Sequence, residues 1–524
     1  MIKTELRPPI ADFSTLSEWS LEHLQQVVAI DSQSDETSPS IPSTEGQRNL
    51  SRALERFFSA FGYATEQDDC ANLVVRIPAT VDGAPKLALM VHIDTAEGTQ
   101  PLDKLLLAPR WTGAPVPYPS NTRLHVSSDA YPATREFLGE DLVHGTGETP
   151  FGLDDKLGMA HLMTLARILA EPGYNHGEIL LVFRPDEEIG RMEALVALAR
   201  RLADEGVRHG YTIDGIAPFE VNVENFNAAG ARLVIPERPI AVGKHRVSLR
   251  MTGVKSHGAT AKAEGYLNAL TVTAQCASEW SGQVIPVQFV TNSLAETNAE
   301  LELAASSETD LDSAIASLRA ALMRHEQRGA HLEVLNKSEG PETASGSVAY
   351  ALKMVRQFIR SEGPLPRLSE HSEGWEGYSN PYSLVSDNTG KGVLRFRLRD
   401  FDPAALKERE AHVTAIVDAF GLSEHLVIES QYTNMGPQLA AFPELSSWAV
   451  AALQPMGIKP KLDPIRGGTG VDPFIDRGIG VANLGTGYFA PESEKEFTSV
   501  QSLTRHAQWL TYLVQVVGSV RTDR

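Results

Sequence analysis

Five side chains that can bind a metal or move a proton stand at the ends of apolar runs. His92 and Asp94 close "KLALMVHID", Glu187 and Glu188 follow "LLVFRPD", and Asp214 closes "YTID". Taken singly, each has an ordinary explanation, because a lone acid after a strand is commonly a turn former. If the runs are neighbouring strands of one sheet, however, one imidazole and several carboxylates converge at a single edge.

Asp154, in "GLDDKLG", adds a further carboxylate at a boundary between loop and helix. Alone it would be interpreted as a helix cap or a first-turn acid. In the cluster, uncompensated carboxylates could not all ionise at neutral pH without a large cost in repulsion and desolvation. No cluster of Lys or Arg accompanies them. Divalent cations would neutralise the group, and mixed nitrogen and oxygen ligands suit zinc, with manganese or cobalt as substitutes.

The adjacent pair Glu187 and Glu188 can divide two tasks. One carboxylate can bind the metal while its neighbour takes a proton from metal-bound water. His92 and Asp94, two apart on a strand, point the same way. Since a metal-bound histidine usually donates its other ring proton to a carboxylate, Asp94 is a candidate partner that orients the imidazole.

Alternating helices and strands would position these residues. Helical periodicity covers 15–28 and 45–61, strands are predicted at 72–77 and 86–94, and a Pro-rich stretch at 99–140 is predicted as a surface excursion. Apolar strands alternating with helices indicate an α/β domain with a mixed, mostly parallel sheet. Ligands of such sheets bind beyond the carboxyl ends of the strands, which is where the polar residues stand.

The chain is predicted to hold two domains. Amphipathic strands and helices over 246–435 indicate an inserted α+β domain, so that 1–245 and 436–524 together form the α/β domain. Within the insertion, 299–344 and 392–435 share the order strand, helix, strand at nearly the same spacing. This favours two similar αβ modules, and two unrelated excursions are the alternative.

Composition narrows the class of protein. The formal net charge of −20 over 524 residues argues against nucleic-acid binding, which needs a basic footprint. The two cysteines lie far apart in the sequence, which argues against a disulfide framework and favours a reducing compartment. Without an apolar signal segment or a run long enough to cross a membrane, a cytoplasmic enzyme is expected.

Several motifs resemble one known family. H-x-D-T-A, G-x-D-D-K, P-D-E-E-x-G, Y-T-x-D-G and E-N-F-N-A-A are similar to peptidase T, the aminotripeptidase branch of the co-catalytic zinc exopeptidases related to aminoacylases and carboxypeptidases. "HGATAK" (257–262), "EGWEGY" (373–378), "LRDFD" (398–402) and "PIRGGT" (464–469) extend the resemblance in the family's order. It implies a zinc-exopeptidase-like catalytic domain with an inserted lid.

The resemblance also implies roles for residues of this chain. Two divalent metal ions, zinc in the first instance, would be bound by His92, Asp154, Glu188, Asp214 and Glu492. Of these, His92 and Asp214 match ligands of the first metal, Glu188 a ligand of the second, and Asp154 the bridge between them. The catalytic assignments are Glu187 as general base, Asp94 as the carboxylate that orients the histidine, and the lid residue His257. Substrate binding would fall to Arg466 and Arg399.

The chain departs from the family pattern at two positions. The family's last ligand is a histidine, whereas Glu492 stands here, with Glu494 two residues on. R-G-G-T-D becomes R-G-G-T-G at Gly470, with an acid displaced to Asp472. The chain is also longer than the family leads one to expect, with the excess inside the lid.

The resulting expectation is a metal-dependent exopeptidase, similar to an aminopeptidase or tripeptidase, acting on short peptides. The alternatives are an amidohydrolase of N-acyl or dipeptide-like substrates, and a relative that binds peptides or metal without turnover. No nucleic-acid or membrane partner is expected. The protein would be a monomer or a homodimer, and two lid modules that pair with each other inside one chain would let a monomer function.

Overall fold

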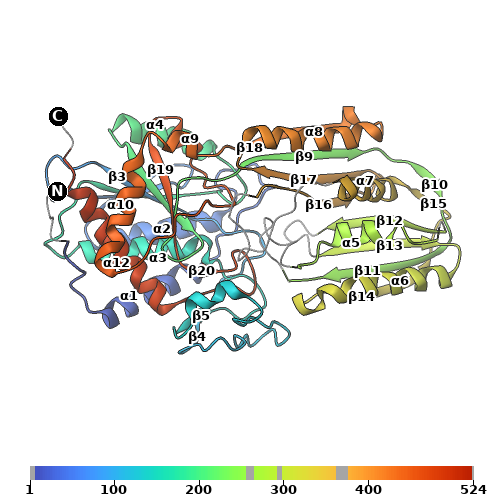
Figure 1. The fold of residues 1–524 in the computed structure, drawn as a ribbon, viewed down its shortest axis with the longest axis horizontal. Coiled ribbons are helices and arrows are strands. Elements are labelled where there is room, and N and C mark those ends of the chain that lie inside the picture. Colours follow the sequence, from blue (N-terminus) through green and yellow to red (C-terminus); the bar gives the residue numbers. More distant parts are fainter. Residues whose placement is uncertain (1–5, 255–264, 282, 292–297, 362–375, 522–524) are drawn as a thin grey trace. The chain divides into compact units, whose positions relative to one another are not determined.

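A computed structural model describes residues 6–254, 265–281, 283–291, 298–361 and 376–521. The chain divides into two compact units (Figure 1). Unit 1 comprises Met1–Asn225 and Asn434–Arg524, and unit 2 comprises Phe226–Thr433. The second unit therefore begins at Phe226 and not at 246. The boundary predicted at 246 falls too late because the segment that follows Phe226 forms a strand in the sheet of unit 2.

The described part of unit 1 contains a seven-stranded mixed sheet in the order β1-β2-β6-β3-β7-β19-β8. The four central strands, from β6 to β19, are mutually parallel, and the outer strands are antiparallel. The bounds are β1 (Ala64–Gln67), β2 (Leu73–Ile77), β3 (Leu87–His92), β6 (Ile179–Arg184), β7 (His209–Gly215), β8 (Val221–Asn222) and β19 (Gly480–Gly485).

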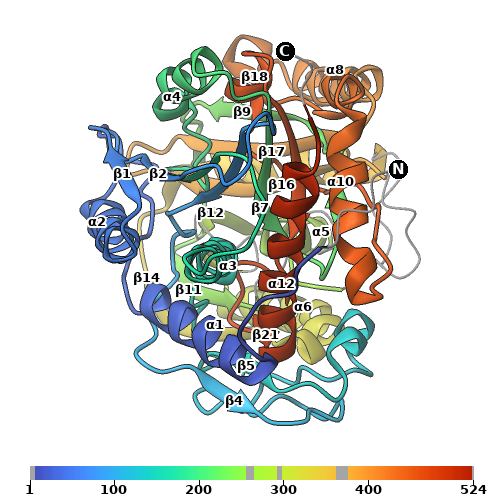
Figure 2. The ribbon, with the colours of Figure 1, turned by 90° about the vertical axis from the view of Figure 1, so that its left-hand side faces the viewer.

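Helices cover this sheet and complete one apolar core with it. Three of them, α1, α3 and α12, pack against one another (Figure 2). The bounds are α1 (Phe13–Val28), α2 (Glu45–Ala60), α3 (Leu153–Leu169), α4 (Glu193–Asp204), α9 (Gly436–Leu439), α10 (Pro443–Leu453), α11 (Asp472–Ile475) and α12 (Val500–Gly518).

The central strands β3 and β6 carry the polar edge of the sheet. Every residue of both strands is buried, as expected where helices cover both faces. They pair in parallel register, so that His92 and Arg184, the last residues of the two strands, are opposite each other. Asp214 lies near the end of β7, the neighbour of β3 on its other side. The expectation that these residues meet at one edge is thus confirmed.

The excursion at 99–140 contributes strand β4 to a second small sheet of unit 1. This sheet has the order β20-β21-β5-β4 and joins the excursion to the segment that precedes α12. Its strands are β4 (Leu106–Ala108), β5 (Leu142–His144), β20 (Tyr488–Phe489) and β21 (Phe497–Ser499), and a 3-10 helix spans Pro132–Phe137.

Unit 2 is built on an eight-stranded antiparallel sheet, as far as its described residues go, in the order β14-β11-β13-β12-β16-β17-β9-β18. Its bounds are β9 (Asn227–Ile235), β11 (His245–Thr252), β12 (Val284–Thr291), β13 (Ala299–Ala305), β14 (His331–Glu339), β16 (Tyr378–Ser386), β17 (Gly392–Asp400) and β18 (Leu426–Tyr432), with β10 (Pro239–Ala241) and β15 (Thr343–Ser345) paired separately. Strand β9 lies between β17 and β18, which is why the unit starts before 246.

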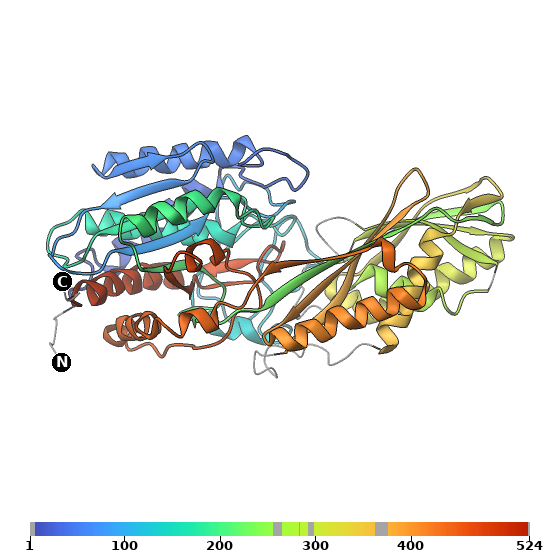
Figure 3. The same ribbon diagram turned by 90° about the horizontal axis from the view of Figure 1, so that it is seen from above.

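Helices α6 (Glu308–Leu322), α5 (Ala269–Cys276), α7 (Ser347–Ser361) and α8 (Pro403–Ala419) follow one another across this sheet (Figure 1). They lie on one side of it (Figure 3) and share a single apolar core with the strands. Exposed charged residues such as Arg250, Glu300 and Glu333 project from the strands and pair with one another.

Among the described residues of unit 2, two motifs share the same order of six main helices and strands. One is β11-α5-β12-β13-α6-β14, and the other is β9-α7-β16-β17-α8-β18. In the sheet they occupy mirrored positions and meet where β12 pairs with β16. The two segments compared in the sequence correspond to β13-α6-β14 and β17-α8-β18. The shared element order agrees with the predicted pair of modules, whereas duplication of one ancestral module stays a prediction.

The seam between β12 and β16 is closed by side-chain hydroxyls. Thr291 Oγ1 donates to the carbonyl oxygen of Leu384 (3.0 Å) and accepts from its amide (2.9 Å). Ser386 Oγ donates to the carbonyl oxygen of Phe289 (3.1 Å) and accepts from its amide (3.1 Å). The two interactions are related by exchange of the strands about the pair Val290–Val385. The seam therefore has the local symmetry of a twofold axis.

In the described part of the chain, no helix is both long and apolar enough to span a bilayer. Cys70 and Cys276 are free cysteines.

Candidate metal centre

Two groups of potential metal ligands lie side by side at the polar edge of unit 1. In the first, the ligand atoms of His92, Asp154 and Asp214 all lie within 4.8 Å of one another. His92 Nε2 is 2.9 Å from Asp154 Oδ1 and 3.4 Å from Asp214 Oδ1. In the second group, the ligand atoms of Asp154, Glu188 and Glu492 also lie within 4.8 Å of one another. Asp154 belongs to both, which is the arrangement required of a bridging ligand.

Each of these side chains comes from the end of an element or from a loop. His92 ends β3, Asp214 lies near the end of β7, and Glu188 follows β6. Asp154 stands in the first turn of α3, where its φ and ψ are not helical. Glu492 follows β20 and has φ +52°, a backbone conformation that residues other than glycine seldom adopt. All five residues predicted from the sequence as ligands are thus brought together.

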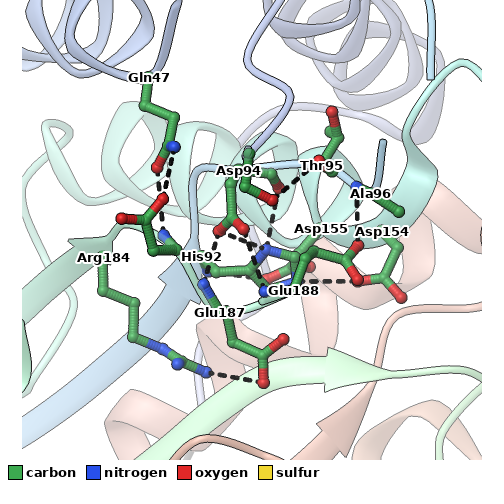
Figure 4. Close-up of polar contacts among 12 residues, drawn as sticks. Gln47, His92, Asp94, Thr95, Ala96, Asp154, Asp155, Arg184, Glu187 and Glu188 are labelled. Atoms are coloured by element: carbon green, nitrogen blue, oxygen red, sulfur yellow. Dashed lines mark hydrogen bonds and ion pairs between the residues drawn. The ribbon is translucent and has the colours of Figure 1, made fainter. Parts of the chain in front are cut away.

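Asp94 ties the histidine to the two glutamates (Figure 4). Its Oδ1 accepts from the amide of Glu187 (2.9 Å) and its Oδ2 from the amide of Glu188 (3.0 Å). His92 Nδ1 lies 2.9 Å from the carbonyl oxygen of Asp94 and 3.4 Å from its Oδ1. Asp94 thus contacts the imidazole mainly through its backbone carbonyl, and its role in orienting a metal-bound histidine stays a prediction. Its carboxylate also fixes the turn that presents both glutamates, which sequence reasoning did not foresee.

Asp186 holds the same turn from the other side. Its backbone has φ +56°, and its buried carboxylate accepts from Ser43 N, Ser43 Oγ and Gln47 Nε2. The side-chain oxygen of Gln47 in turn accepts from the amide of Asp186 (3.1 Å). Glu187 thus extends from a backbone that is fixed by hydrogen bonds at Asp186 and at Asp94.

Glu496 supports the loop that leads to Asp154. Its buried Oε1 accepts from the amides of Phe151 (2.5 Å) and Gly152 (2.8 Å). Burial raises the pKa of Glu496 to about 8. Lys156, buried one turn further on, donates from Nζ to the carbonyl oxygen of Ile30 (2.6 Å). Neither contact could be expected from the sequence, because the partners are distant along the chain.

Without a cation, Asp154, Glu187 and Glu188 keep their protons to higher pH than free carboxyl groups do, because the pKa of each is raised. Burial, and then the charge of Asp214, raise the pKa of Asp154 to about 6. Burial, with the charges of Glu492 and Asp154, raises the pKa of Glu188 well above its ordinary value. Burial also raises the pKa of Glu187 to about 7, against the lowering effect of His92 and Arg184. A divalent cation would reverse these shifts, so the donor set fits the metal ions that the sequence predicts.

The pKa of His92 is raised as well, although burial acts on a histidine in the opposite direction. Burial by itself would lower the pKa of His92, but the charge of Asp214 and hydrogen bonds with Asp154 and Asp94 raise it well above its ordinary value. A proton on Nε2 therefore occupies the position where a metal ion would bind, and binding would displace it.

One basic residue at this edge was overlooked in the sequence. Arg184, the last residue of β6, is fully buried, with Nη2 3.9 Å from Glu187 Oε1 and 4.0 Å from Asp214 Oδ2. No cluster of Lys or Arg was expected here, yet the guanidinium of Arg184 faces two of the carboxylates. The signal was an arginine at the end of an otherwise apolar run.

Three further residues were assigned from the resemblance. Arg466 is partly buried in the loop that also carries Thr469 and Gly470. Arg399 belongs to unit 2, where Nη1 donates to the carbonyl oxygens of Ala229 (3.2 Å) and Leu398 (3.0 Å). His257 lies outside the described residues.

A family model of peptidase family M20/M25/M40 matches residues 129–516, and the chain belongs to this family. It is accordingly a peptidase, a hydrolase that acts on peptides. Two relatives, called peptidase T, come from Macrococcus caseolyticus and Salmonella arizonae. Each is 24% identical over 95% of this chain and 98% of its own length.

Solved structures of similar fold include a tripeptidase from Staphylococcus aureus (TM-score 0.51, 16% identity, 96% of this chain and 98% of that one). An aminoacylhistidine dipeptidase from Vibrio alginolyticus is similar to the same degree (TM-score 0.52, 16% identity, 96% and 98%). Because their sequence identities to this chain are low, these solved structures support its fold alone. They agree with the predicted combination of an α/β domain and an inserted α+β domain.

Proposed function

We propose that the protein is a metal-dependent exopeptidase that releases the amino-terminal residue of short peptides, tripeptides in particular. The observation that carries the proposal is the pair of ligand groups that share Asp154, with Glu187 held beside them. The full-length similarity to two proteins called peptidase T supports this substrate class.

The residues of the centre have separate tasks in this proposal. His92, Asp154 and Asp214 would hold one divalent cation, and Asp154, Glu188 and Glu492 a second. The cations would supply Lewis-acid polarisation of the scissile carbonyl and of the nucleophilic water. Zinc suits this mixed donor set, and manganese or cobalt could replace it.

Glu187 is proposed as the general base. A carboxylate held beside the two ligand groups can accept a proton from the nucleophilic water and return it to the leaving amine. Asp94 and Asp186 fix the backbone on either side of it, so that the carboxylate needs little rearrangement before proton transfer. Arg466, a planar and permanently charged group, is proposed to bind the carboxylate of the peptide, with Arg399 as a further substrate contact. His257 is proposed as the catalytic histidine of the lid.

Unit 1 is proposed as the catalytic domain and unit 2 as the lid. The pairing of β12 with β16 inside one chain supports a protein that can function as a monomer. A location in the cytoplasm stays a prediction.

The test uses protein loaded with zinc or manganese and a panel of tripeptides, each with a free or an acetylated amino terminus. Mass spectrometry of the products should show the amino-terminal residue released from the free peptides only. Cleavage confined to the acetylated peptides would instead support the amidohydrolase. Metal binding without cleavage of any substrate would support the non-catalytic alternative.

A further inference from the structure

Arg184 is among the largest fully buried side chains of the described chain, yet its guanidinium is incompletely hydrogen-bonded. Nη2 donates to the carbonyl oxygen of Thr469 (2.9 Å). Within the described residues, Nε and Nη1 are buried and have no hydrogen-bond partner. Such a permanently charged group is costly to bury, and opposite charge nearby must offset that cost.

The opposite charge comes from two carboxylates of the candidate centre. Nη2 of Arg184 lies 3.9 Å from Glu187 Oε1 and 4.0 Å from Asp214 Oδ2 (Figure 4 shows the contact with Glu187). The other oxygen of Asp214 faces His92 Nε2 at 3.4 Å. Asp214, a member of the first ligand group, therefore contacts His92 with one carboxylate oxygen and faces the guanidinium with the other.

Gly470 provides the space for this guanidinium. Its φ is +56°, and a Cβ placed on it would lie 2.2 Å from Arg184 Nη1 and 3.0 Å from Cζ. Every other residue at 470 would thus collide with the charged end of Arg184. The guanidinium of Arg184 thus fills the space that a side chain at position 470 would need.

We propose that Arg184 is a positioning residue of the metal centre and that Gly470 makes its placement possible. The proposal rests on the metal-dependent function proposed above. The fixed positive charge holds Asp214 and Glu187 in place before a cation binds. Because the same charge repels a cation at the first ligand group, it also weakens metal binding there. The protein thereby gains a preformed site and gives up part of its affinity for the metal.

The test measures Zn²⁺ and Mn²⁺ binding calorimetrically in the full chain, without substrate, for Arg184→Met, Arg184→Gln and Arg184→Lys. Loss of the charge in the first two variants should tighten binding at one of two sites on the order of tenfold. It should also lower the melting temperature of the metal-free protein, since the carboxylates then repel one another without compensation. Arg184→Lys retains the charge and should bind metal within about threefold of the wild type.

Arg246→Met is the matched control. Arg246 is also a buried arginine, but it lies in unit 2 and donates to the carbonyl oxygens of Gly243 and Pro341. This variant should lose thermal stability without a change in metal affinity. A purely structural role of Arg184 predicts the same result for Arg184→Met, so unchanged or weaker metal binding in that variant would overturn the proposal.

Folding of the variants does not leave the question open. If Arg184→Met is insoluble, the metal affinities of Arg184→Gln and Arg184→Lys are compared instead. If only Arg184→Lys folds, a change of tenfold or more in its metal affinity contradicts the proposal. Peptide hydrolysis by the wild type is measured in parallel. Failure of hydrolysis with intact metal binding rejects the proposed function alone, whereas failure of the affinity ratios rejects the role of Arg184 alone.

Discussion

His92 and Arg184 face each other as the last residues of two paired parallel strands, β3 and β6. One register therefore places a potential metal ligand beside a permanent positive charge at the same sheet edge. Glu187 and Glu188 follow Arg184 after only Pro185 and Asp186, which brings both carboxylates to this edge as well. The predictions below test how this edge and the sheet of unit 2 work.

Glu187→Gln should retain both metals and lose activity by about 10²–10⁴-fold, the usual contribution of a general base. Glutamine keeps the shape of the side chain but cannot accept the proton. Metal content by plasma mass spectrometry and kcat on a tripeptide give the two readouts. Glu193→Gln, at an exposed position on α4, is the control and should behave as the wild type. A variant that loses metal but regains activity on remetallation would make Glu187 a ligand instead.

Glu492→Ala should lower metal occupancy from two ions towards one, because the second ligand group loses one of its three carboxylates. Glu492→His should be tolerated and retain two ions, since imidazole is a good zinc ligand. Equilibrium dialysis followed by metal analysis measures both. Glu494→Ala is the control. If Glu492→Ala binds two ions at full affinity, Glu494 or a water completes the second group.

Metal removal should destabilise the protein more at pH 7 than at pH 5. In the metal-free protein the raised pKa values of Asp154, about 6, and Glu187, about 7, mean that the folded state holds protons which the unfolded state has released. Stability of the metal-free form therefore falls as pH rises through this window. His92, whose pKa is also raised, acts in the same direction at higher pH.

In the metal-loaded form the cations compensate the ionised carboxylates, so this loss is absent. Melting temperatures of chelator-treated and metal-loaded protein, measured between pH 5 and 7.5, should diverge as pH rises. Calorimetry in two buffers of different ionisation enthalpy should also show protons released on metal binding. A gap in melting temperature that is constant with pH would contradict the expectation.

Activity per mole of protein should stay constant on dilution through the nanomolar range. The two motifs of unit 2 are tethered in one chain, which gives their association an effective concentration of order millimolar whatever the protein concentration. Progress curves at serial dilutions, with sedimentation velocity at the highest concentration, provide the measurement. Activity that falls with dilution in parallel with a dimer dissociating would show that a second chain is required.

Most of the candidate site residues could be predicted from the sequence because they end or follow a strongly apolar run. A buried parallel strand gives a clear signal, and the residue after it must lie at the carboxyl edge of the sheet. His92, Asp94, Glu188 and Asp214 were found in this way. Glu492 was found only through the resemblance, since no periodic pattern surrounds it.

Arg184 and the start of unit 2 depend on contacts between distant parts of the chain. The burial of Arg184 becomes acceptable only because Gly470, far along the sequence, leaves room for its guanidinium. Strand β9 belongs to unit 2 because its partners, β17 and β18, come much later in the chain. A local sequence pattern contains no information about such distant partners. The buried Arg184 and the segment of β9 could therefore be seen in the sequence, but their structural roles could not be predicted.

The nested order of unit 2 has a consequence for how the chain folds. The motif β11-α5-β12-β13-α6-β14 lies entirely between β9 and α7, and β10 pairs with β15 where this insertion begins and ends. During synthesis the inner motif is complete when β14 emerges, whereas β9 has no partner until β17 and β18 follow. We expect the inner motif to fold first, while β9 stays without a strand partner. The order of synthesis, and not only the stability of the final fold, therefore determines which strands are at risk of pairing wrongly.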